Sequence, residues 1–142
     1  MVSMQTFFTA LADRTRRRIL NLIRDRELCV CFFTEVLDVS QPKISRHLAY
    51  LRNAEIVAAR REGKWMYYRI VEPEDLYAAQ ILHDTLDWLA SEERMLADYE
   101  KLNLVCTSPN APVQIVRAPP PHILRKADVS FPKTEELDTF LL

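Results

Sequence analysis

Glycine is almost missing from this sequence, since Gly63 is the single glycine among 142 residues. Phosphate-binding loops of the GxxxxGK and GxGxxG types need several glycines close together, so enzymes that hold nucleotides through such loops are excluded. The sequence also has no apolar run near the ~20 residues that span a bilayer, which argues against a membrane protein. Its first residues are neither basic nor followed by a long apolar stretch, so we expect no secretory signal.

Cysteine is scarce as well, with three residues in the chain. An odd number of cysteines without a secretory signal favours free thiols in a reducing compartment over a disulfide scaffold. We therefore expect a cytoplasmic protein. A small enzyme and a binding module both remain compatible with the composition.

The formal net charge of −1 hides an uneven distribution. Residues 1–72 carry a net charge of +5, and residues 73–142 carry −6. A basic half joined to an acidic half suggests an anionic partner for the first half, although charge runs are more often solvated faces.

Short helices are predicted in the basic half from apolar residues at helical spacing. The predicted helices cover residues 3–11, 14–25, 32–37 and 41–53. Asp13 is expected to cap the second helix, and Ser40 to cap the fourth, where Pro42 falls in the first turn. Between the second and third helices, residues 27–31 are expected to form a short connection.

A β-hairpin is predicted next, from two β-type runs at residues 56–61 and 65–70 joined by a turn that contains Gly63. After Pro73, one long helix is expected over residues 74–102. Its apolar stripe is too long for one copy to bury, which predicts a homodimer formed through the first helix and this long helix. The stripe consists of Leu82, Leu86, Leu89, Leu96 and Tyr99.

The order of these elements predicts the fold class. It is a mainly α-helical protein with a small β-hairpin (α+β), arranged as a winged helix-turn-helix. Residues 1–103 would form the DNA-binding and dimerisation domain. Residues 104–142 would form a C-terminal tail, because five prolines between positions 109 and 121 prevent regular helix or central strand.

Double-stranded DNA is the anionic partner that this arrangement favours. The N-terminal half of the fourth helix is expected to enter a major groove, where Gln pairs with adenine and Arg with guanine. The wing is expected to contact phosphates or the adjacent minor groove. The predicted DNA-binding residues are Ser40, Gln41, Lys43, Ser45, Arg46, His47 and Tyr50 on the helix, and Arg60, Arg61 and Lys64 on the hairpin. The alternative is a solvated basic helix beside a solvated hairpin.

Several short motifs resemble one family. Residues 27–31 (ELCVC) resemble the metalloid-binding box of the ArsR family of arsenic-responsive repressors, and residues 40–48 (SQPKISRHL) resemble its recognition helix. Residues 63–69 resemble its wing, and residues 11–16 its first helix junction. The resemblance covers roughly residues 4–102. It implies a homodimeric repressor that binds an operator with an imperfect inverted repeat and leaves it when As(III) or Sb(III) binds.

The cysteine chemistry fits that implication, because soft thiolates select thiophilic ions over Mg, Ca or Mn. Cys29 and Cys31 lie two positions apart. On a regular helix such positions lie about 200° apart and cannot chelate one small ion. Binding through both therefore requires a non-helical start of the third helix, next to the DNA-reading helix. The alternative is two buried, inert cysteines.

One departure from the family pattern concerns the third thiol. The commonest arsenic box has another cysteine three residues after the second, where this chain has Thr34, and acidic residues or His where it has Phe32 and Phe33. Cys106 is the candidate third ligand, from the same or the opposite subunit. Two thiols with a small exogenous ligand would also form a weaker site.

The sequence disfavours three other functions to different degrees. Zinc sensing on the long helix needs paired Asp and His ligands, and that helix offers one histidine, His83, with Asp84 and Asp87. A winged-helix repressor that senses another thiol-reactive signal, such as a soft metal ion or an oxidant, is the main alternative. An enzyme with a cysteine nucleophile would need a base and a phosphate cradle. Neither is visible, so we expect no enzyme and no organic cofactor.

Overall fold

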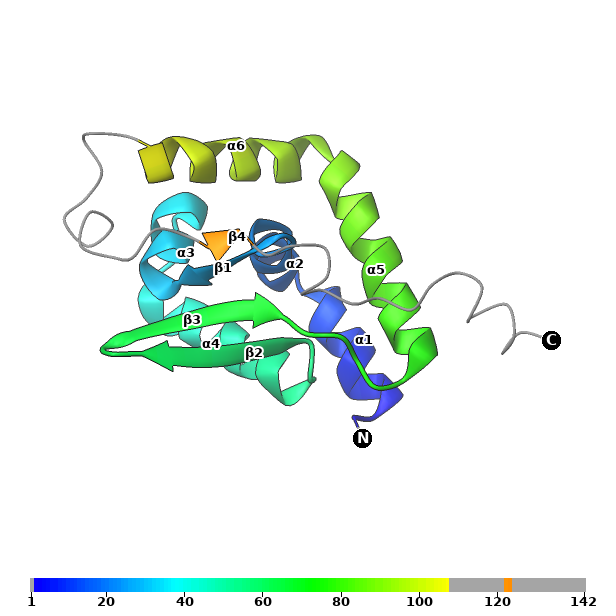
Figure 1. Ribbon diagram of the computed structural model, residues 1–142. Helices are drawn as coiled ribbons and strands as arrows, with labels where there is room; N and C mark the ends of the chain where they lie inside the picture. The colour runs from blue at the N-terminus through cyan, green and yellow to red at the C-terminus, as the bar shows by residue number, and fades with distance from the viewer. Residues whose placement is uncertain (1, 108–121, 124–142) are drawn as a thin grey trace.

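The computed structural model describes residues 2–107, 122 and 123 (Figure 1). In chain order the elements are α1 (Met4–Ala12), α2 (Arg14–Leu22), β1 (Arg26–Cys29), α3 (Val30–Leu37), α4 (Gln41–Asn53), β2 (Val57–Glu62), β3 (Trp65–Ile70), α5 (Leu76–Ser91), α6 (Glu93–Thr107) and β4 (His122–Ile123). Helices α3 and α4 form the helix-turn-helix, and β2 with β3 forms the wing. The winged helix-turn-helix prediction is therefore confirmed. None of the described helices combines the length and apolar character that crossing a bilayer requires.

The first two helices begin at short polar side chains, as capping rules predict. Ser3 accepts a hydrogen bond from the backbone N–H of Thr6, and Asp13 accepts one from the backbone N–H of Arg16. Asp75 does the same at the start of α5. Each cap satisfies an N–H group that has no partner inside its helix.

The wing matches the predicted hairpin. Strands β2 and β3 pair antiparallel from Val57 opposite Ile70 to Glu62 opposite Trp65. Gly63 follows in the turn with a φ of +61°, a left-handed conformation that glycine adopts without the steric cost of a Cβ.

The segment before α3 differs from the sequence prediction. Residues 26–29 form β1, a buried strand that pairs with β3 through Leu28 opposite Tyr68 and Cys29 opposite Tyr67. The sheet order is β2-β3-β1-β4, so β1 lies beside the wing. Pairing with β3 satisfies backbone groups that a loop in the core would leave without partners. Helix α3 accordingly begins at Val30 rather than at Phe32.

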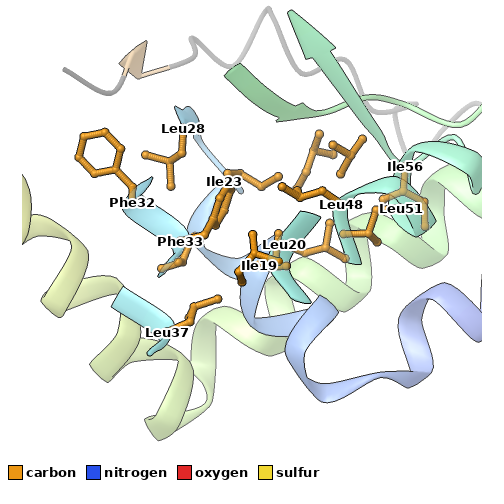
Figure 2. Close-up of a cluster of buried hydrophobic side chains, with 14 of the residues drawn as sticks. Ile19, Leu20, Ile23, Leu28, Phe32, Phe33, Leu37, Leu48, Leu51 and Ile56 are labelled. Carbon is orange, nitrogen blue, oxygen red and sulfur yellow. The ribbon is translucent and has the colours of Figure 1, made fainter. Parts of the chain in front are cut away.

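The core lies between the helices and the sheet (Figure 2). Side chains from α2, β1, α3, α4 and the start of the wing converge there, and each is at most 3 % exposed. The residues labelled in the figure are Ile19, Leu20, Ile23, Leu28, Phe32, Phe33, Leu37, Leu48, Leu51 and Ile56. Because α3 and α4 share this close-packed core, a shift of one helix displaces the other.

The predicted single helix over residues 74–102 is wrong. The chain turns at Glu92, which has extended backbone angles (φ −83°, ψ 134°), and α6 then crosses α2 and α3 (Figure 1). The turn allows Met95 and Leu102, one face of α6, to reach the core. Helix α6 also runs to Thr107, beyond the expected boundary at 103, and residues 108–121 and 124–142 lie outside the described part of the tail.

The leucine stripe has partners within one chain. Leu82, Leu86 and Leu89 are 0 %, 6 % and 4 % exposed, whereas Leu96 is 42 % exposed. Most of the stripe therefore needs no second copy, because the turn at Glu92 folds α6 over the same core that α5 contacts.

Polar contacts hold α6 in place. Arg18 of α2 makes two bonds with Asp98, from Nε to Oδ2 at 2.7 Å and from an Nη to Oδ1 at 3.0 Å. The side-chain amide of Asn21 donates to the backbone carbonyl of Met95 at 2.8 Å. These contacts fix the first half of α6 against α2.

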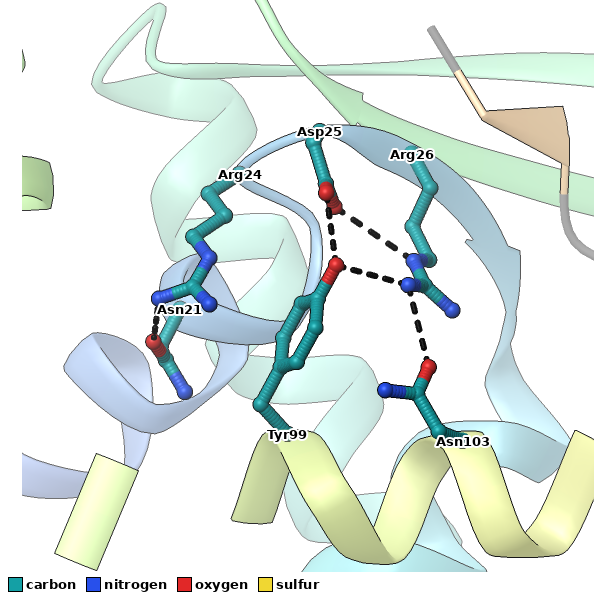
Figure 3. Close-up of polar contacts among 6 residues, drawn as sticks. All are labelled: Asn21, Arg24, Asp25, Arg26, Tyr99 and Asn103. Atoms are coloured by element: carbon teal, nitrogen blue, oxygen red, sulfur yellow. Dashed lines mark hydrogen bonds and ion pairs between the residues drawn. The ribbon is translucent and has the colours of Figure 1, made fainter. Parts of the chain in front are cut away.

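A second polar cluster holds the other half of α6 against the loop before β1 (Figure 3). The Tyr99 hydroxyl donates to Asp25 at 2.6 Å and accepts from Arg26 at 2.7 Å. Arg26 also donates to Asn103 at 3.2 Å, and the guanidinium of Arg24 stacks on the Tyr99 ring at 4.1 Å. The helix that carries Cys106 is thereby tied to the strand that carries Cys29.

Candidate nucleic-acid interface and cysteine site

The helix-turn-helix presents one polar face of α4 to solvent. The turn between α3 and α4 contains Asp38, which ends α3 in the left-handed region (φ 55°). Ile44, Leu48 and Leu51 anchor the opposite face of α4 in the core. The exposed residues at the start of α4 are Ser40, Gln41, Lys43, Ser45 and Arg46. This surface has the residue types that read base edges in a major groove.

The start of α4 agrees with the capping prediction in position. Ser40 occupies the N-cap, and Pro42 lies in the first turn. The Ser40 hydroxyl makes no capping hydrogen bond, however, and the residue is exposed.

His47 and Tyr50, also predicted to contact DNA, have partners inside the chain. The guanidinium of Arg16 donates to Nδ1 of His47 at 3.3 Å and stacks on the Tyr50 ring at 4.2 Å. Burial lowers the pKa of His47, Asp13 opposes this, and Arg16 lowers it further. The imidazole is therefore neutral at physiological pH, with Nδ1 free to accept the bond.

The basic residues of the wing divide into two kinds. Arg61 and Lys64 are exposed near the hairpin tip, and Arg61 donates to the backbone carbonyl of Gly63. Arg60 instead binds two carboxylates, Glu27 at 2.6 Å and Glu62 at 2.7 Å. These carboxylates raise the pKa of Arg60, so its charge is already balanced within the chain.

The cysteine pair lies at the junction of β1 and α3. Cys29 ends β1 and is the N-cap of α3, with extended backbone angles (φ −77°, ψ 159°) and 2 % exposure. Cys31 lies in the first turn of α3 and is partly buried. The predicted non-helical backbone is thus present at Cys29 and absent at Cys31. The two thiols are close enough for Cys31 to influence the pKa of Cys29.

Burial governs the acidity of these thiols. It raises the pKa of Cys29 to about 11, with Cys31 and Glu27 adding to the effect and Arg60 opposing it. Burial also raises the pKa of Cys31. Both groups are therefore thiols rather than thiolates at neutral pH, unlike the activated cysteines of enzymes.

The remaining candidate ligands lie elsewhere. Cys106 is an exposed residue in the last turn of α6; desolvation raises the pKa of its thiol and Arg26 opposes the rise. Where the family has its third box cysteine, the Thr34 hydroxyl donates to the carbonyl of Cys31. Within residues 2–107, 122 and 123, no three His, Cys, Asp or Glu side chains are grouped to hold a metal ion. In a single chain the three cysteines are therefore not brought into one site.

The residues for which zinc sensing was disfavoured lie on α5. Nε2 of His83 is 3.1 Å from a carboxylate oxygen of Asp87, one turn away, and Asp84 accepts a hydrogen bond from Gln80. These are helix-surface contacts between neighbouring turns.

Comparisons with known proteins identify the family. The profile described as bacterial regulatory protein, arsR family, matches residues 13–59. The arsenic resistance transcriptional regulator ArsR1 of Pseudomonas putida is 44 % identical over 107 residues, covering 75 % of this chain and 82 % of that protein. The chain belongs to the ArsR family. The arsenical resistance operon repressor of Escherichia coli is 43 % identical over 91 residues, covering 63 % of this chain and 76 % of that protein.

A solved structure agrees with the fold of this ArsR-family chain. HlyU from Vibrio cholerae matches with a TM-score of 0.51 and 26 % identity, covering 59 % of this chain and 88 % of that one. Family members are helix-turn-helix transcriptional repressors and not enzymes, so the expectation of a non-enzymatic DNA-binding repressor is confirmed.

Sequence reasoning missed two residues that organise this site. Glu27 is a buried acid that binds Arg60, and no sequence signal marked it, because residues 27–31 were expected to form a short connection. Arg16 connects α1, α2 and α4, but it lies within a run of arginines whose members look alike in the sequence.

Proposed function

We propose that this ArsR-family repressor is a homodimer that releases operator DNA when trivalent arsenic or antimony binds Cys29 and Cys31. The observation that carries the proposal is the position of the two thiols at the β1–α3 junction, where α3 packs against the DNA-reading helix α4. The relatives named for arsenic resistance support the choice of ligand.

The ligand chemistry needs no oxidant and no net proton release. Each step replaces one hydroxyl of As(OH)₃ by a protein sulfur: an As–S bond forms, As–O and S–H bonds break, and water leaves. Thiols with raised pKa values can react in this way, because the thiol proton leaves with the hydroxyl. The buried setting of Cys29 then excludes water from the product.

Binding is transmitted to DNA through α3. Cys29 is extended and Cys31 is helical, and we expect that drawing both onto one ion displaces the first turn of α3. Helix α3 shares the core with α4 through Phe33 and Leu48, and packed cores transmit such displacements. The exposed face of α4 then loses its fit to the major groove.

Cys106 is the third ligand in this proposal. It lies on α6, which packs on α3. A bond from Cys106 to the ion requires the end of α6 to approach the junction in the same subunit, or the partner's helix to supply the thiol. A substitution at Cys106 tests the ligand role in either case.

The dimer is proposed to form through α1 and α5. An apolar groove of about 310 Å³ is bordered by Met4, Phe8 and Tyr77, which are 76 %, 46 % and 46 % exposed. The groove also includes Phe7 and Ile81. Exposed aromatic and Met side chains beside a groove are typical of protein interfaces. A two-fold dimer places two α4 helices in successive major grooves about 34 Å apart, so the operator is an imperfect inverted repeat.

Fluorescence anisotropy of a labelled duplex from the region upstream of its own gene tests the function. The wild type is expected to bind the duplex and to dissociate with arsenite or antimonite. Cys29→Ser and Cys31→Ser should bind the duplex and resist release, because one thiol cannot hold the ion against competing thiols. Cys106→Ser should need more arsenite than the wild type.

Two results would contradict this mechanism. Full release of the Cys29→Ser and Cys31→Ser double variant by arsenite would remove the cysteine pair from the mechanism. Release of the wild type by cadmium or diamide but not by arsenite would favour a repressor of another thiol-reactive signal.

A further inference from the structure

A buried acid connects the cysteine strand to the wing. Glu27 of β1 is 4 % exposed, and its carboxylate binds the guanidinium of Arg60 on β2. The Arg60 Nη–Oε1 distance is 2.6 Å, and the Nε–Oε2 distance is 3.4 Å, so both carboxylate oxygens face the same side chain. β1 is bonded to β3 and not directly to β2. The ion pair therefore crosses the middle strand.

The same face of the sheet carries Cys29. Cys29 lies opposite Tyr67 in the β1–β3 pair, and Tyr67 lies opposite Arg60 in the β2–β3 pair. The Arg60 guanidinium stacks on the Tyr67 ring at 4.4 Å. Alternate residues of a strand share a face, so Glu27 and Cys29 point the same way. Cys29, Tyr67, Arg60 and Glu27 form one contiguous group, which we name the β1–wing cluster.

We propose that Glu27 is a positioning residue that couples the cysteine site to the wing, so that the Glu27–Arg60 pair carries part of the ligand's effect on DNA affinity. This inference rests on the proposed function of Cys29. It adds a route through the sheet to the route from α3 to α4.

The geometry explains why a ligand on Cys29 and Cys31 should lower the affinity of the wing for DNA. Drawing Cys29 and Cys31 onto one ion displaces the end of β1, and Glu27 lies two residues earlier on the same strand. A buried carboxylate with two oxygens on one guanidinium tolerates little displacement without losing a bond. The wing follows through Arg60, and the exposed Arg61 and Lys64 near the hairpin tip move with it.

Glu62 provides a matched control. Its carboxylate also binds Arg60, at 2.7 Å, but it lies on the wing itself and its side chain is 67 % exposed. Glu27→Gln and Glu62→Gln therefore each remove one carboxylate from the same guanidinium, and the first alone removes the ion pair with β1. Glutamine keeps the size and an acceptor oxygen, and the half-exposed Arg60 can be hydrated, so folding is preserved in both.

The experiment measures the coupling factor, the ratio of the DNA dissociation constants with and without saturating arsenite. Coupling factors of about 5 to 150 are typical of allosteric proteins. Glu27→Gln is expected to bind DNA and arsenite within about threefold of the wild type and to lower the coupling factor at least fivefold. Glu62→Gln should keep the wild-type factor. A cycle of Glu27→Gln, Arg60→Lys and the double variant should show that the two effects on coupling are not additive.

A second measurement follows the wing directly. In a Trp88→Phe background Trp65 of β3 is the remaining tryptophan of the two in the chain. Arsenite should change its emission, and Glu27→Gln should abolish that change while arsenite still binds.

An unchanged coupling factor in Glu27→Gln, or an equal loss in Glu62→Gln, would overturn the inference and leave the proposed function standing. A wild type that arsenite does not release would overturn both. An arsenite dissociation constant raised as much as the coupling factor falls would show that Glu27 supports the ligand site alone, and would also overturn it.

Discussion

The contact between Arg18 and Asp98 makes a quantitative prediction about how α6 is held. The two side chains are 12 % and 8 % exposed and share two short bonds. Asp98→Ala removes the carboxylate and leaves the guanidinium in a largely buried place without its counter-ion. The helix that carries Cys106 then loses its strongest polar attachment to α2.

The expected loss of stability in Asp98→Ala follows from the burial of the ion pair. Removing one partner of a buried ion pair costs about 3–5 kcal/mol, because the remaining charge stays desolvated. Arg18 retains some contact with solvent, so we expect the lower end, about 3 kcal/mol. For a chain of this size that corresponds to a fall in Tm of roughly 10 °C. The Arg18→Met and Asp98→Leu double variant should lose much less, since it leaves no unpaired charge.

Denaturant unfolding followed by far-UV circular dichroism measures the free energy of each variant. Glu100→Ala is the matched control, because it removes an exposed acid two residues further along α6. The free energy of unfolding of Glu100→Ala should lie within about 0.5 kcal/mol of the wild-type value. A loss below about 1 kcal/mol for Asp98→Ala would refute the reasoning, and so would a double variant less stable than Asp98→Ala.

Three further predictions concern the site and the wing. Arg46→Ala should reduce discrimination between operator and mismatched duplexes by about 1–3 kcal/mol, whereas Lys64→Ala should weaken all duplexes alike and lower the salt slope by about 1, as measured by anisotropy titrations. Gly63→Ala should cost about 1 kcal/mol in denaturant unfolding because a Cβ is strained at a φ of +61°, although it meets no atom within 4 Å; a neutral result would contradict this. The pKa of Cys29 is raised from 9.0 to about 11, so the folded state disfavours the thiolate. The free energy of unfolding should therefore fall by about 2 kcal/mol as the pH rises from 9 to 11, and Cys29→Ser should reduce that fall.

Capping and turn rules correctly predicted the starts of two helices and the hairpin turn, because each depends on residues close together in the sequence. Asp13 caps α2, Pro42 lies in the first turn of α4, and Gly63 makes the hairpin turn, each within a few residues of the group it serves. The exposed face of α4 also followed from periodicity, because Ile44 and Leu48 fix which side enters the core.

The wrong or missing predictions concern elements whose structure depends on residues far away in the sequence. A leucine stripe shows that a helix has an apolar face, but it does not show whether the partner is a second copy or the same chain after a turn at Glu92. Strand β1 is four residues long, and it exists because β3 lies beside it. The partners of Arg60 could not be read from the sequence either, since Glu27 is 33 positions away.

The guanidinium of Arg16 connects α1, a helix of the proposed dimer interface, to α4. Arg16 donates to the carbonyls of Thr9 and Ala10 at the end of α1, and it holds His47 and Tyr50 of α4 from the same position. In the proposed dimer α1 forms part of the interface, so we expect this side chain to help set the distance from the interface to each α4. His47 and Tyr50 remain partly exposed, so their contacts with DNA stay a prediction beside these internal contacts. We expect the contacts with Arg16 to set the spacing of the two recognition helices, and the exposed residues at the start of α4 to read the sequence.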